Sequence, residues 1–502
     1  MNVAFRVDAS NQIGTGHFMR CLTLANALKQ RGVQTQFVSR QMPEHLRDML
    51  AEKKHEFMPF NSRPSKEAAD DLAHAHWLGT SQAQDATDTI HALSNQTWDW
   101  LVVDHYALDI RWESALRQMA ENILVIDDLA DRQHDCNVLL DQNFYVDAET
   151  RYVGKVPEHC QLLLSPRYAL LREEFQQLRE QVKPRKGPVK RVLVFFGGVD
   201  TDNYTALAIE ALTNIGINEL QVDVVIGAQH PFRESIRAAC IRHNFTCHVQ
   251  TDRMAELMAL ADLSIGAGGS AIWERCCLGS PTITICSADN QRNQIADAAL
   301  EGLLYAPEVK DSLHLVIECH VRSLIENKCL RQLISRNGIQ AVDGRGALRI
   351  VGSMGCSGIE IRTAKLEDSE QLFVWRNHPT IRVVSRNTGV IKWENHSRWF
   401  ASVLSDPNRL LLIGQRNKTP IGVVRFDIRN NEAEISIYLV PESEIPIHGS
   451  DLLQSAERWL SCNRPDVNII EAHVLGGNER SQHLFLAAGY QVESTFYFKR
   501  LH

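Results

Sequence analysis

Short apolar runs alternate with amphipathic helical segments from the first residues of the chain onward. The predicted elements are a strand at 2–7, a helix at 18–31, a strand at 33–39, a helix at 44–53 and strands at 100–104 and 123–127. Strands that alternate with helices in this way form a mostly parallel sheet with helices on both faces. The N-terminal part therefore predicts an α/β fold with a Rossmann-like sheet.

A second run of the same kind begins near Lys190, after a charged predicted helix at 170–183 and a turn-rich linker at 184–188. Further strands are predicted at 222–227 and 262–266. Ligands of parallel sheets bind at the carboxyl ends of the strands. Two such halves joined by a linker therefore predict a ligand cleft between them.

A third change of composition falls at Gly352–Gly358, where small and flexible residues dominate. A new strand is predicted directly afterwards at 359–362, and a hairpin is predicted around Asn417-Lys418. We expect four segments, which are residues 1–160, residues 161–350, a linker at 351–358 and a C-terminal domain at 359–502.

The composition is that of a globular protein, with 44% hydrophobic and 23% charged residues among 502. A net charge of -8 argues against nucleic acid as the main partner. The 12 cysteines show no Cys-x-x-Cys pair and no zinc spacing, which predicts free thiols and no metal site. The N-terminus has no signal-peptide pattern, and no apolar run approaches the roughly 20 residues that a bilayer requires. We therefore expect a cytoplasmic protein without a membrane partner.

His17 is the first candidate for chemistry, because it follows a glycine pair, Gly14 and Gly16, where a predicted strand gives way to a helix. Unpaired backbone N–H groups at a helix start favour anions, and glycines allow a substrate to approach the backbone. An imidazole at this point can act as a base beside an anionic ligand. The alternative is a capping or surface histidine beside glycines that are needed only for the turn.

Residues 262–294 form a second candidate, in which a strand enters a glycine turn, a helix follows, and a further strand ends in amide side chains. The turn presents donors to a diphosphate, and a glutamate one helical turn later can accept hydrogen bonds from ribose hydroxyls. The alternative is a tight turn followed by a solvated glutamate. The residues of this run that we expect to contact a nucleotide sugar are Gly268, Gly269, Ser270, Glu274, Asn290 and Gln291.

The second run resembles the nucleotide-binding half of the GT-B glycosyltransferase-like fold. The N-terminal motifs Arg6–Ser10 and Ile13–Ala25 resemble those of the UDP-sugar hydrolases of pseudaminic acid biosynthesis. Further motifs of that family are seen at Asp104–Tyr106, Ile126–Ala130, Asp141–Asn143, Tyr168–Arg172 and Phe195–Asp200. The resemblance covers roughly residues 1–345.

This resemblance implies hydrolysis of UDP-2,4-diacetamido-2,4,6-trideoxy-β-L-altropyranose to UDP and the free sugar, with inversion and without a metal or cofactor. His17 carries over as the general base that activates water on the face opposite the leaving group. A diphosphate held by donors is already a good leaving group, so no separate acid is required. The further substrate-binding residues that the resemblance implies are Asp8, Gly16, Tyr106 and Arg172. Asp8 is expected to orient His17 or a substrate amide, and Tyr106 and Asn290 to contact the sugar.

The C-terminal domain resembles the Gcn5-related N-acetyltransferases, and in particular the acetyltransferase of the same pathway. The motifs are Trp375–Asn377, Glu394–His396, Asn478–Ser481 and Gly489-Tyr490. The resemblance implies acetyl-CoA as cosubstrate and acetylation of the 4-amino group of the UDP-linked precursor, with Gly449, Asn478 and Ser481 as CoA contacts. It also leaves open an association with other enzymes of the pathway.

Two features depart from the acetyltransferase pattern. The pyrophosphate loop reads Glu444–Gly449, in which Glu444 repels phosphate and Pro446 lacks an N–H donor. Phe485 stands where many relatives have a tyrosine that reprotonates the CoA thiolate, and a phenyl ring donates no proton. Two alternatives therefore stay open: a C-terminal module for substrate binding or assembly, and a UDP-sugar glycosyltransferase with such a module appended.

Overall fold

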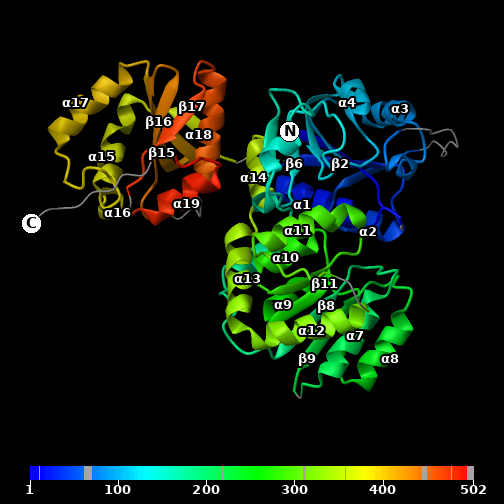
Figure 1. Ribbon diagram of the computed structural model, residues 1–502. Helices are drawn as coiled ribbons and strands as arrows, with labels where there is room; N and C mark the ends of the chain where they lie inside the picture. Colours follow the sequence, from blue (N-terminus) through cyan, green and yellow to red (C-terminus); the bar gives the residue numbers. More distant parts are fainter. Residues whose placement is uncertain are drawn as a thin grey trace, which may run out of the picture. The chain divides into compact units, whose positions relative to one another are not determined.

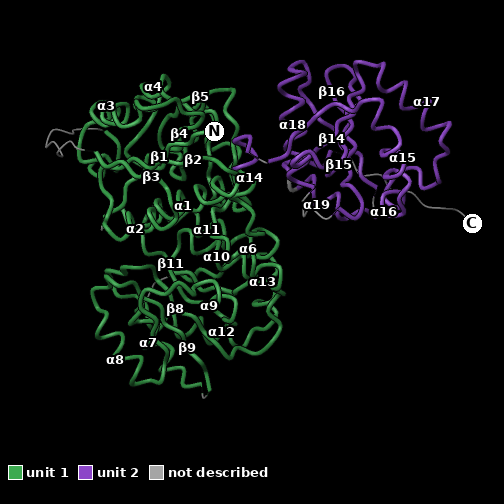
Figure 2. Tube along the Cα trace, turned by 180° about the vertical axis from the view of Figure 1, so that it is seen from behind, with its two compact units in different colours: residues 1–350 green, residues 351–502 purple. Residues whose placement is uncertain are grey.

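The computed structural model describes residues 1–10, 12–60, 71–217, 219–308, 312–356, 358–443, 449–475 and 477–493. The chain divides into two compact units, residues 1–350 and residues 351–502 (Figure 2). Helix α14 (Gly346–Ser353) crosses this division, so the first three residues of the predicted linker are helical.

The first half of unit 1 is a seven-stranded parallel sheet in the order β3-β2-β1-β4-β5-β6-β7 (Figure 1). Its strands are β1 (Asn2–Val7), β2 (Gln34–Ser39), β3 (Glu56–Pro59), β4 (Trp98–Asp104), β5 (Ala120–Ile126), β6 (Val138–Asp141) and β7 (Gln161–Leu164). Its helices are α1 (Gly16–Lys29), α2 (Glu44–Glu52), the 3-10 turn η1 (Ala75–Trp77), α3 (Gln82–Leu93), α4 (Ile110–Leu116), α5 (Ala148–Arg151) and the 3-10 turn η2 (Pro166–Tyr168).

The second half of unit 1 is a five-stranded parallel sheet in the order β10-β9-β8-β11-β12. Its strands are β8 (Arg191–Phe195), β9 (Gln221–Ile226), β10 (Thr246–Val249), β11 (Leu263–Ala267) and β12 (Thr282–Ile285). The helices of this part are α6 (Glu173–Arg179), α7 (Tyr204–Ile215), α8 (Arg233–Arg242), α9 (Met254–Leu260), α10 (Ala271–Cys277), the 3-10 turn η3 (Asp289–Gln291), α11 (Arg292–Leu300), α12 (Leu313–Glu326) and α13 (Lys328–Ala341).

Both faces of the second sheet are buried. Successive residues of a strand point to opposite faces, so Val192 and Val194 join the core cluster that includes α7 and α12. Leu193 joins the other cluster, with Trp273 of α10. Strands covered on both faces read as continuous apolar runs, which is how β8 and β11 were predicted. The predicted fold class, two Rossmann-like halves of a GT-B type, is confirmed.

The predicted charged helix at 170–183 is shorter in the structure, where α6 spans Glu173–Arg179. Arg172 is extended, with φ −60° and ψ 154°, and the buried Leu170 donates its N–H to the side chain of Gln142 at 3.0 Å. Burial of this segment against the core therefore outweighs its helical propensity.

Unit 2 is a five-stranded sheet in the order β13-β14-β15-β16-β17. Its strands are β13 (Glu360–Thr363), β14 (Arg409–Arg416), β15 (Thr419–Arg429), β16 (Glu432–Leu439) and β17 (Ile469–Ala472). Its helices are the 3-10 turn η4 (Leu366–Asp368), α15 (Ser369–Asn377), α16 (Pro379–Arg382), α17 (Trp393–Leu404), α18 (Gly449–Asn463) and α19 (Glu479–Ala487).

The predicted hairpin is the pair β14–β15, and Asn417 and Lys418 both have positive φ, at 50° and 66°. This left-handed pair matches the twist of the flanking strands. Helices α18 and α19 pack on one face of the sheet, and α15 and α17 pack on the other (Figure 1). No described helix is both long and apolar enough to cross a membrane.

Candidate active site

A cavity of about 200 Å³ lies between the two halves of unit 1. Its walls come from loops that follow β1, β4, β5 and β6 of the first sheet and β11 and β12 of the second. This is the strand end at which parallel sheets bind ligands. The sequence-predicted residues that line it are Gly16, His17, Tyr106, Gly269, Ser270, Asn290 and Gln291.

His17 lies in the first turn of α1 and is held by a buried carboxylate. Its Nδ1 is 2.6 Å from Oδ1 of Asp104, the last residue of β4, and their side chains are 11% and 0% exposed. A terminal nitrogen of Arg20 also lies 3.1 Å from Nδ1, but the shorter contact is with the carboxylate, which only accepts hydrogen bonds; this contact places the proton on Nδ1 and leaves the lone pair on Nε2. This arrangement leaves the imidazole able to accept a proton from a molecule in the cavity.

The Asp104 carboxylate is in turn fixed by Arg20, one turn further along α1. Arg20 donates to both oxygens, from Nε to Oδ2 and from a terminal nitrogen to Oδ1, each at 2.6 Å. Burial by itself would raise the pKa of Asp104, but the charge of Arg20 and the hydrogen bonds from Arg20 and His17 lower it below its usual range. Asp104 therefore stays ionised and keeps its orienting role across the neutral pH range.

Aromatic rings form the wall beside the imidazole. The ring of Tyr106 meets that of His17 edge-on at 4.6 Å, and Trp77 stacks on Tyr106 at 5.6 Å. Trp77 lines the cavity from the 3-10 turn η1, and sequence reasoning missed it. The one signal was an aromatic residue in a polar stretch that belongs to no predicted element.

Asp128, which follows β5, adds a second carboxylate to the cavity wall. Its Oδ1 accepts from the Tyr106 hydroxyl at 2.5 Å, its Oδ2 accepts from Nδ2 of Asn143 at 3.0 Å, and Arg20 lies 3.5 Å away. The side chain is 16% exposed. Asp128 and Asn143 belong to two of the sequence motifs, but the sequence predicts no role for either residue.

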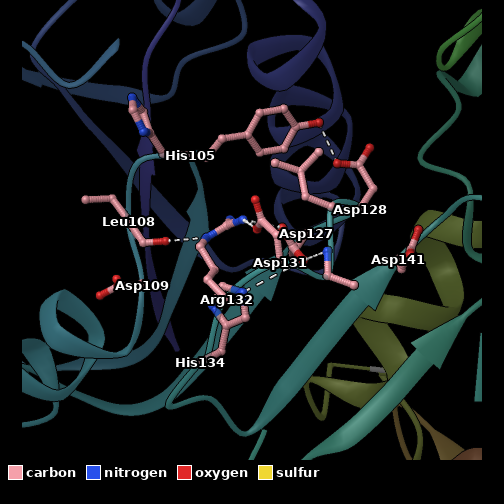
Figure 3. A network of polar contacts seen from close by, with 12 residues as sticks. His105, Leu108, Asp109, Asp127, Asp128, Asp131, Arg132, His134 and Asp141 are labelled. Atoms are coloured by element: carbon pink, nitrogen blue, oxygen red, sulfur yellow. Dashed lines mark hydrogen bonds and ion pairs between the residues drawn. The ribbon is translucent and has the colours of Figure 1, made fainter. Parts of the chain in front are cut away.

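The neighbouring residue, Asp127, holds the same loop through contacts with other residues of that loop (Figure 3). It pairs with Arg132 at 2.9 Å and accepts from the backbone N–H of Ala130 at 2.9 Å. His134 belongs to the same network. Burial by itself would lower the pKa of His134, but the neighbouring carboxylates of Glu113 and Asp127 raise it to about 9. The loop that presents Asp128 is therefore tied to a buried, ionised network.

The expectation that Asp8 orients His17 is wrong, because the carboxylate at His17 is that of Asp104. Asp8 is fully buried and turns away from the cavity, toward Arg6 at 2.8 Å and the Ser39 hydroxyl at 2.7 Å. Burial would raise its pKa, but the charge of Arg6 and the contact with His105 hold it well below the usual value. Asp8 is therefore part of the polar core and is not placed to meet a substrate amide.

The glycine turn of the second half lies across the cavity from His17. Gly269 has φ +77°, a conformation that favours glycine, and a Cβ on Gly268 would lie 2.5 Å from Oε1 of Gln291. That Oε1 is buried and has no hydrogen-bond partner among the described residues. Gly269, Ser270 and Gln291 therefore offer backbone N–H, hydroxyl and amide groups to a polar ligand.

Gly268, Glu274 and Arg172 lie beside this cavity and do not form its wall. The Glu274 carboxylate faces the Arg172 guanidinium at 3.9 Å, and their side chains are 19% and 29% exposed. Burial raises the pKa of Glu274, although Arg172 opposes the shift. The structure brings these two predicted residues together, one turn into α10 from the glycine turn.

Unit 2 has a cavity of its own, of about 380 Å³. β16 pairs with β17 only as far as Ile435 and Ala472, and β16 then continues to Leu439, so the two strands separate. The cavity lies at this split and is lined from both faces of the sheet, by Phe485 of α19 on one side and Trp399 of α17 on the other. A split of this kind exposes strand backbone to a ligand.

The predicted CoA contacts are divided. Asn478 and Ser481 line the cavity, and the Asn478 side chain caps α19 by accepting from the Ser481 N–H at 3.1 Å. Gly449 is the first residue of α18 and lies outside the cavity wall. Residues 444–448 of the predicted pyrophosphate loop lie outside the described residues.

The α15–α17 side of this cavity is rich in positive charge. Arg376, Arg386 and Arg425 line it, whereas Glu434, which Arg386 contacts at 2.8 Å, is the one carboxylate in its wall among the described residues. A terminal nitrogen of Arg376 is buried without a hydrogen-bond partner in the described part of the chain. Tyr438 also lines this wall, and burial raises the pKa of its phenol, so it remains a proton donor.

Known proteins match both units. Residues 191–303 match the glycosyltransferase family 28 C-terminal domain, and residues 359–491 match the acetyltransferase (GNAT) domain. The chain therefore joins a unit of GT-B-like fold to a domain that matches the GNAT model. In the GT-B-like unit, the family 28 match begins at β8 and includes the glycine turn and the strand-end amides.

Three relatives show how far this arrangement extends. An uncharacterized protein of Methanocaldococcus jannaschii is 22% identical over 98% of this chain and 97% of its own length. The UDP-2,4-diacetamido-2,4,6-trideoxy-beta-L-altropyranose hydrolase of Campylobacter jejuni is 25% identical over 60% of this chain and 97% of its own. The spore coat polysaccharide biosynthesis protein SpsG of Bacillus subtilis is 22% identical over 70% of this chain and 96% of its own.

Proposed function

We propose that the GT-B-like unit hydrolyses UDP-2,4-diacetamido-2,4,6-trideoxy-β-L-altropyranose to UDP and the free sugar, with inversion at the anomeric carbon. The observation that carries this proposal is that His17, in the wall of the cavity between the two halves, is paired with the buried carboxylate of Asp104. The Campylobacter jejuni hydrolase, which matches over nearly its whole length, supports the substrate. Hydrolysis of a UDP-sugar needs one activated water and one stabilised leaving group, and the two walls offer these separately.

In the proposed reaction, Nε2 of His17 takes a proton from a water molecule as the water oxygen bonds to the anomeric carbon. The bond from that carbon to the diphosphate oxygen breaks, and UDP leaves with the electron pair. Donors of the Gly269–Ser270 turn and the Gln291 amide offset the charge that develops on the diphosphate. Asp104 stabilises the imidazolium until its proton passes to solvent.

The test is turnover of the UDP-sugar followed by NMR, with UDP release as the readout. We expect the wild-type chain to release UDP in buffer without an acceptor, and His17→Ala to lose this release while keeping its melting temperature. His45→Ala is the matched control, because His45 is exposed on α2. A glycosyltransferase would leave the substrate intact until an acceptor is added, so acceptor-dependent release refutes the hydrolase.

We further propose that the GNAT domain transfers an acetyl group from acetyl-CoA to the 4-amino group of the UDP-linked precursor. The GNAT match and the split between β16 and β17 support acetyl-CoA as the donor. The nitrogen–carbon bond forms as the thioester carbon–sulfur bond breaks, the thiolate leaves with the electron pair, and the proton lost by the amine passes to solvent. Tyr438 offers the thiolate a proton donor that Phe485 cannot supply.

Arg386 is paired with Glu434 and Arg425 with Asp427, whereas a terminal nitrogen of Arg376 has no hydrogen-bond partner among the described residues, and this guanidinium favours an acceptor that is an anion. A diphosphate satisfies guanidinium groups, whereas a free amino sugar would bring a further positive charge into the cavity. Acetylation would therefore precede the release of UDP by the other unit. The test incubates labelled acetyl-CoA with the UDP-linked amine and, separately, with the free amino sugar. We expect label in the UDP-linked product, and no label in either product would favour a non-catalytic module.

A further inference from the structure

Asp128 is held in one orientation by groups from both halves of unit 1. Tyr106 and Asn143 each donate to one of its carboxylate oxygens, at 2.5 and 3.0 Å. Asn143 is 5% exposed, and its own carbonyl oxygen accepts from Trp273 at 3.0 Å and from Gln294 at 2.9 Å. Because that oxygen takes both donors, the Asn143 NH₂ group has to face Asp128.

Trp273 and Gln294 belong to the half that carries the glycine turn. Trp273 lies in α10, directly after the turn, and Gln294 lies in α11, three residues after Gln291. The side chains of Trp273 and Gln294 are both buried. The second half therefore sets the rotamer of a carboxylate that stands on the catalytic side of the cavity.

The charge on the two sides of the cavity is different. On the His17 side, Arg20 and Asp128 line the cavity, the buried Asp104 is paired with Arg20, and the Arg151 guanidinium lies 3.5 Å from the centre of the Tyr145 ring. Across the cavity, Gly269, Ser270 and Gln291 contribute neutral donors. Gly269, Ser270 and Gln291 can donate hydrogen bonds to a diphosphate, whereas the Asp128 carboxylate cannot, so a diphosphate held by the second side leaves the glycosyl carbon near Asp128.

We propose that Asp128 is a catalytic carboxylate that stabilises the positive charge developing on the sugar ring, and that Asn143 is the residue that positions it. Glycosyl transfer to water passes through an oxocarbenium-like transition state, which a preorganised negative charge favours over the neutral ground state. This role rests on the proposed hydrolysis of a UDP-sugar. In this proposal His17 acts on the water, and Asp128 acts on the sugar.

The test compares full-length Asp128→Asn with wild type on the UDP-diacetamido sugar. The asparagine keeps the shape and can still accept from Asn143 while donating to the Tyr106 oxygen, so the charge is what is lost. We expect kcat to fall about 100-fold with KM changed little. The affinity for UDP should stay the same, because UDP contacts the other wall. Asp131→Asn is the matched control, on an exposed side chain of the same loop.

A double variant tests the role of Asn143. If Asn143 acts through Asp128, then Asn143→Ala lowers kcat, and the combination with Asp128→Asn is no slower than Asp128→Asn alone. Additive losses would show separate structural effects and refute the positioning role. An Asp128→Asn enzyme with wild-type kcat, or with a loss in KM alone, would overturn the catalytic role. Failure of the wild-type chain to release UDP would instead refute hydrolysis, and this role with it.

Discussion

Replacing Asp104 by asparagine should remove the base function of His17 while leaving the cavity in place. The substitution is nearly isosteric, but the new amide has one acceptor oxygen where the carboxylate of Asp104 has two. Arg20 donates to both oxygens and His17 donates to one of them. His17 and a terminal nitrogen of Arg20 share Oδ1, whereas Nε of Arg20 donates to Oδ2, so an NH₂ group at the Oδ1 position meets both His17 and Arg20. In that orientation the His17 proton moves to Nε2, and the imidazole can no longer accept a proton from water.

Two magnitudes follow from this geometry. In a Ser-His-Asp triad the corresponding substitution lowers kcat about 10⁴-fold through the wrong tautomer, and about 10³- to 10⁴-fold is expected here, or about 4–5.5 kcal/mol of barrier. Removing one partner of a buried ion pair costs about 3–5 kcal/mol of stability. The substituted amide keeps one acceptor and Arg20 keeps Asp128 at 3.5 Å, so the lower end of that range, about 3 kcal/mol, applies.

The assay measures UDP release by the full-length variant well below its melting temperature, together with UDP affinity by calorimetry. We expect a loss of release with unchanged UDP affinity, since the nucleotide contacts that we propose come from the second half. Asp135→Asn is the matched control, because its ion pair with Arg117 is partly exposed and such pairs contribute little. An Asp104→Asn chain that releases UDP within tenfold of the wild-type rate would refute the orientation of His17 by Asp104.

Three further substitutions test other parts of the structure. Burial, and then the charge of Asp128, raise the pKa of Asp141 to about 8. The contribution of this group to the free energy of unfolding is therefore fully present below about pH 4 and is lost as the pH rises toward 8. The melting temperature of Asp141→Asn relative to wild type should therefore rise across this window, and a constant difference would contradict the shift. Gly268→Ala places a Cβ 2.5 Å from Oε1 of Gln291, and we expect about tenfold weaker UDP binding by calorimetry, whereas unchanged affinity would separate Gln291 from the nucleotide. Asn478→Ala removes the cap of α19 and should cost unit 2 about 1 kcal/mol in thermal unfolding and weaken acetyl-CoA binding; loss of stability alone would leave Asn478 with a purely structural role.

The fold class was predictable because each element has a local signal in the sequence. Apolar runs in β1, β4, β8 and β11 are long enough to identify strands that are buried on both faces, and glycines mark the turns that follow β1, β8 and β11. The turn residues Asn417 and Lys418 predicted a hairpin because both can adopt the left-handed conformation that a two-residue turn requires. His17, Gly269 and Gln291 were found for the same reason, since strand ends in parallel sheets converge.

Residues that act through long-range contacts carry no such signal. Trp77 reaches the cavity wall by stacking on Tyr106, which lies in another loop of the first half. Asn143 gains its place from Trp273 and Gln294, more than a hundred residues away in the chain. Neither spacing nor residue type indicates these partners, because the first pair depends on how two loops of one half pack and the second on how the two sheets face each other.

Asp8 was predicted to orient His17, but Asp104 is the carboxylate that contacts it. The specific cause of this difference is the register of two neighbouring strands. Both aspartates follow apolar runs, and both fall at the carboxyl end of the first sheet. β1 and β4 pair so that Val7 lies opposite Asp104, which places Asp8 one residue further along. Side chains alternate between the faces of a sheet, so a shift of one residue turns the two carboxylates to opposite faces. Asp8 shares its face with Arg6, two residues earlier, and is neutralised in the core, whereas Asp104 faces α1 and His17. The identity of the residue that orients the base is therefore decided by a one-residue register, which the sequence of either strand alone does not contain.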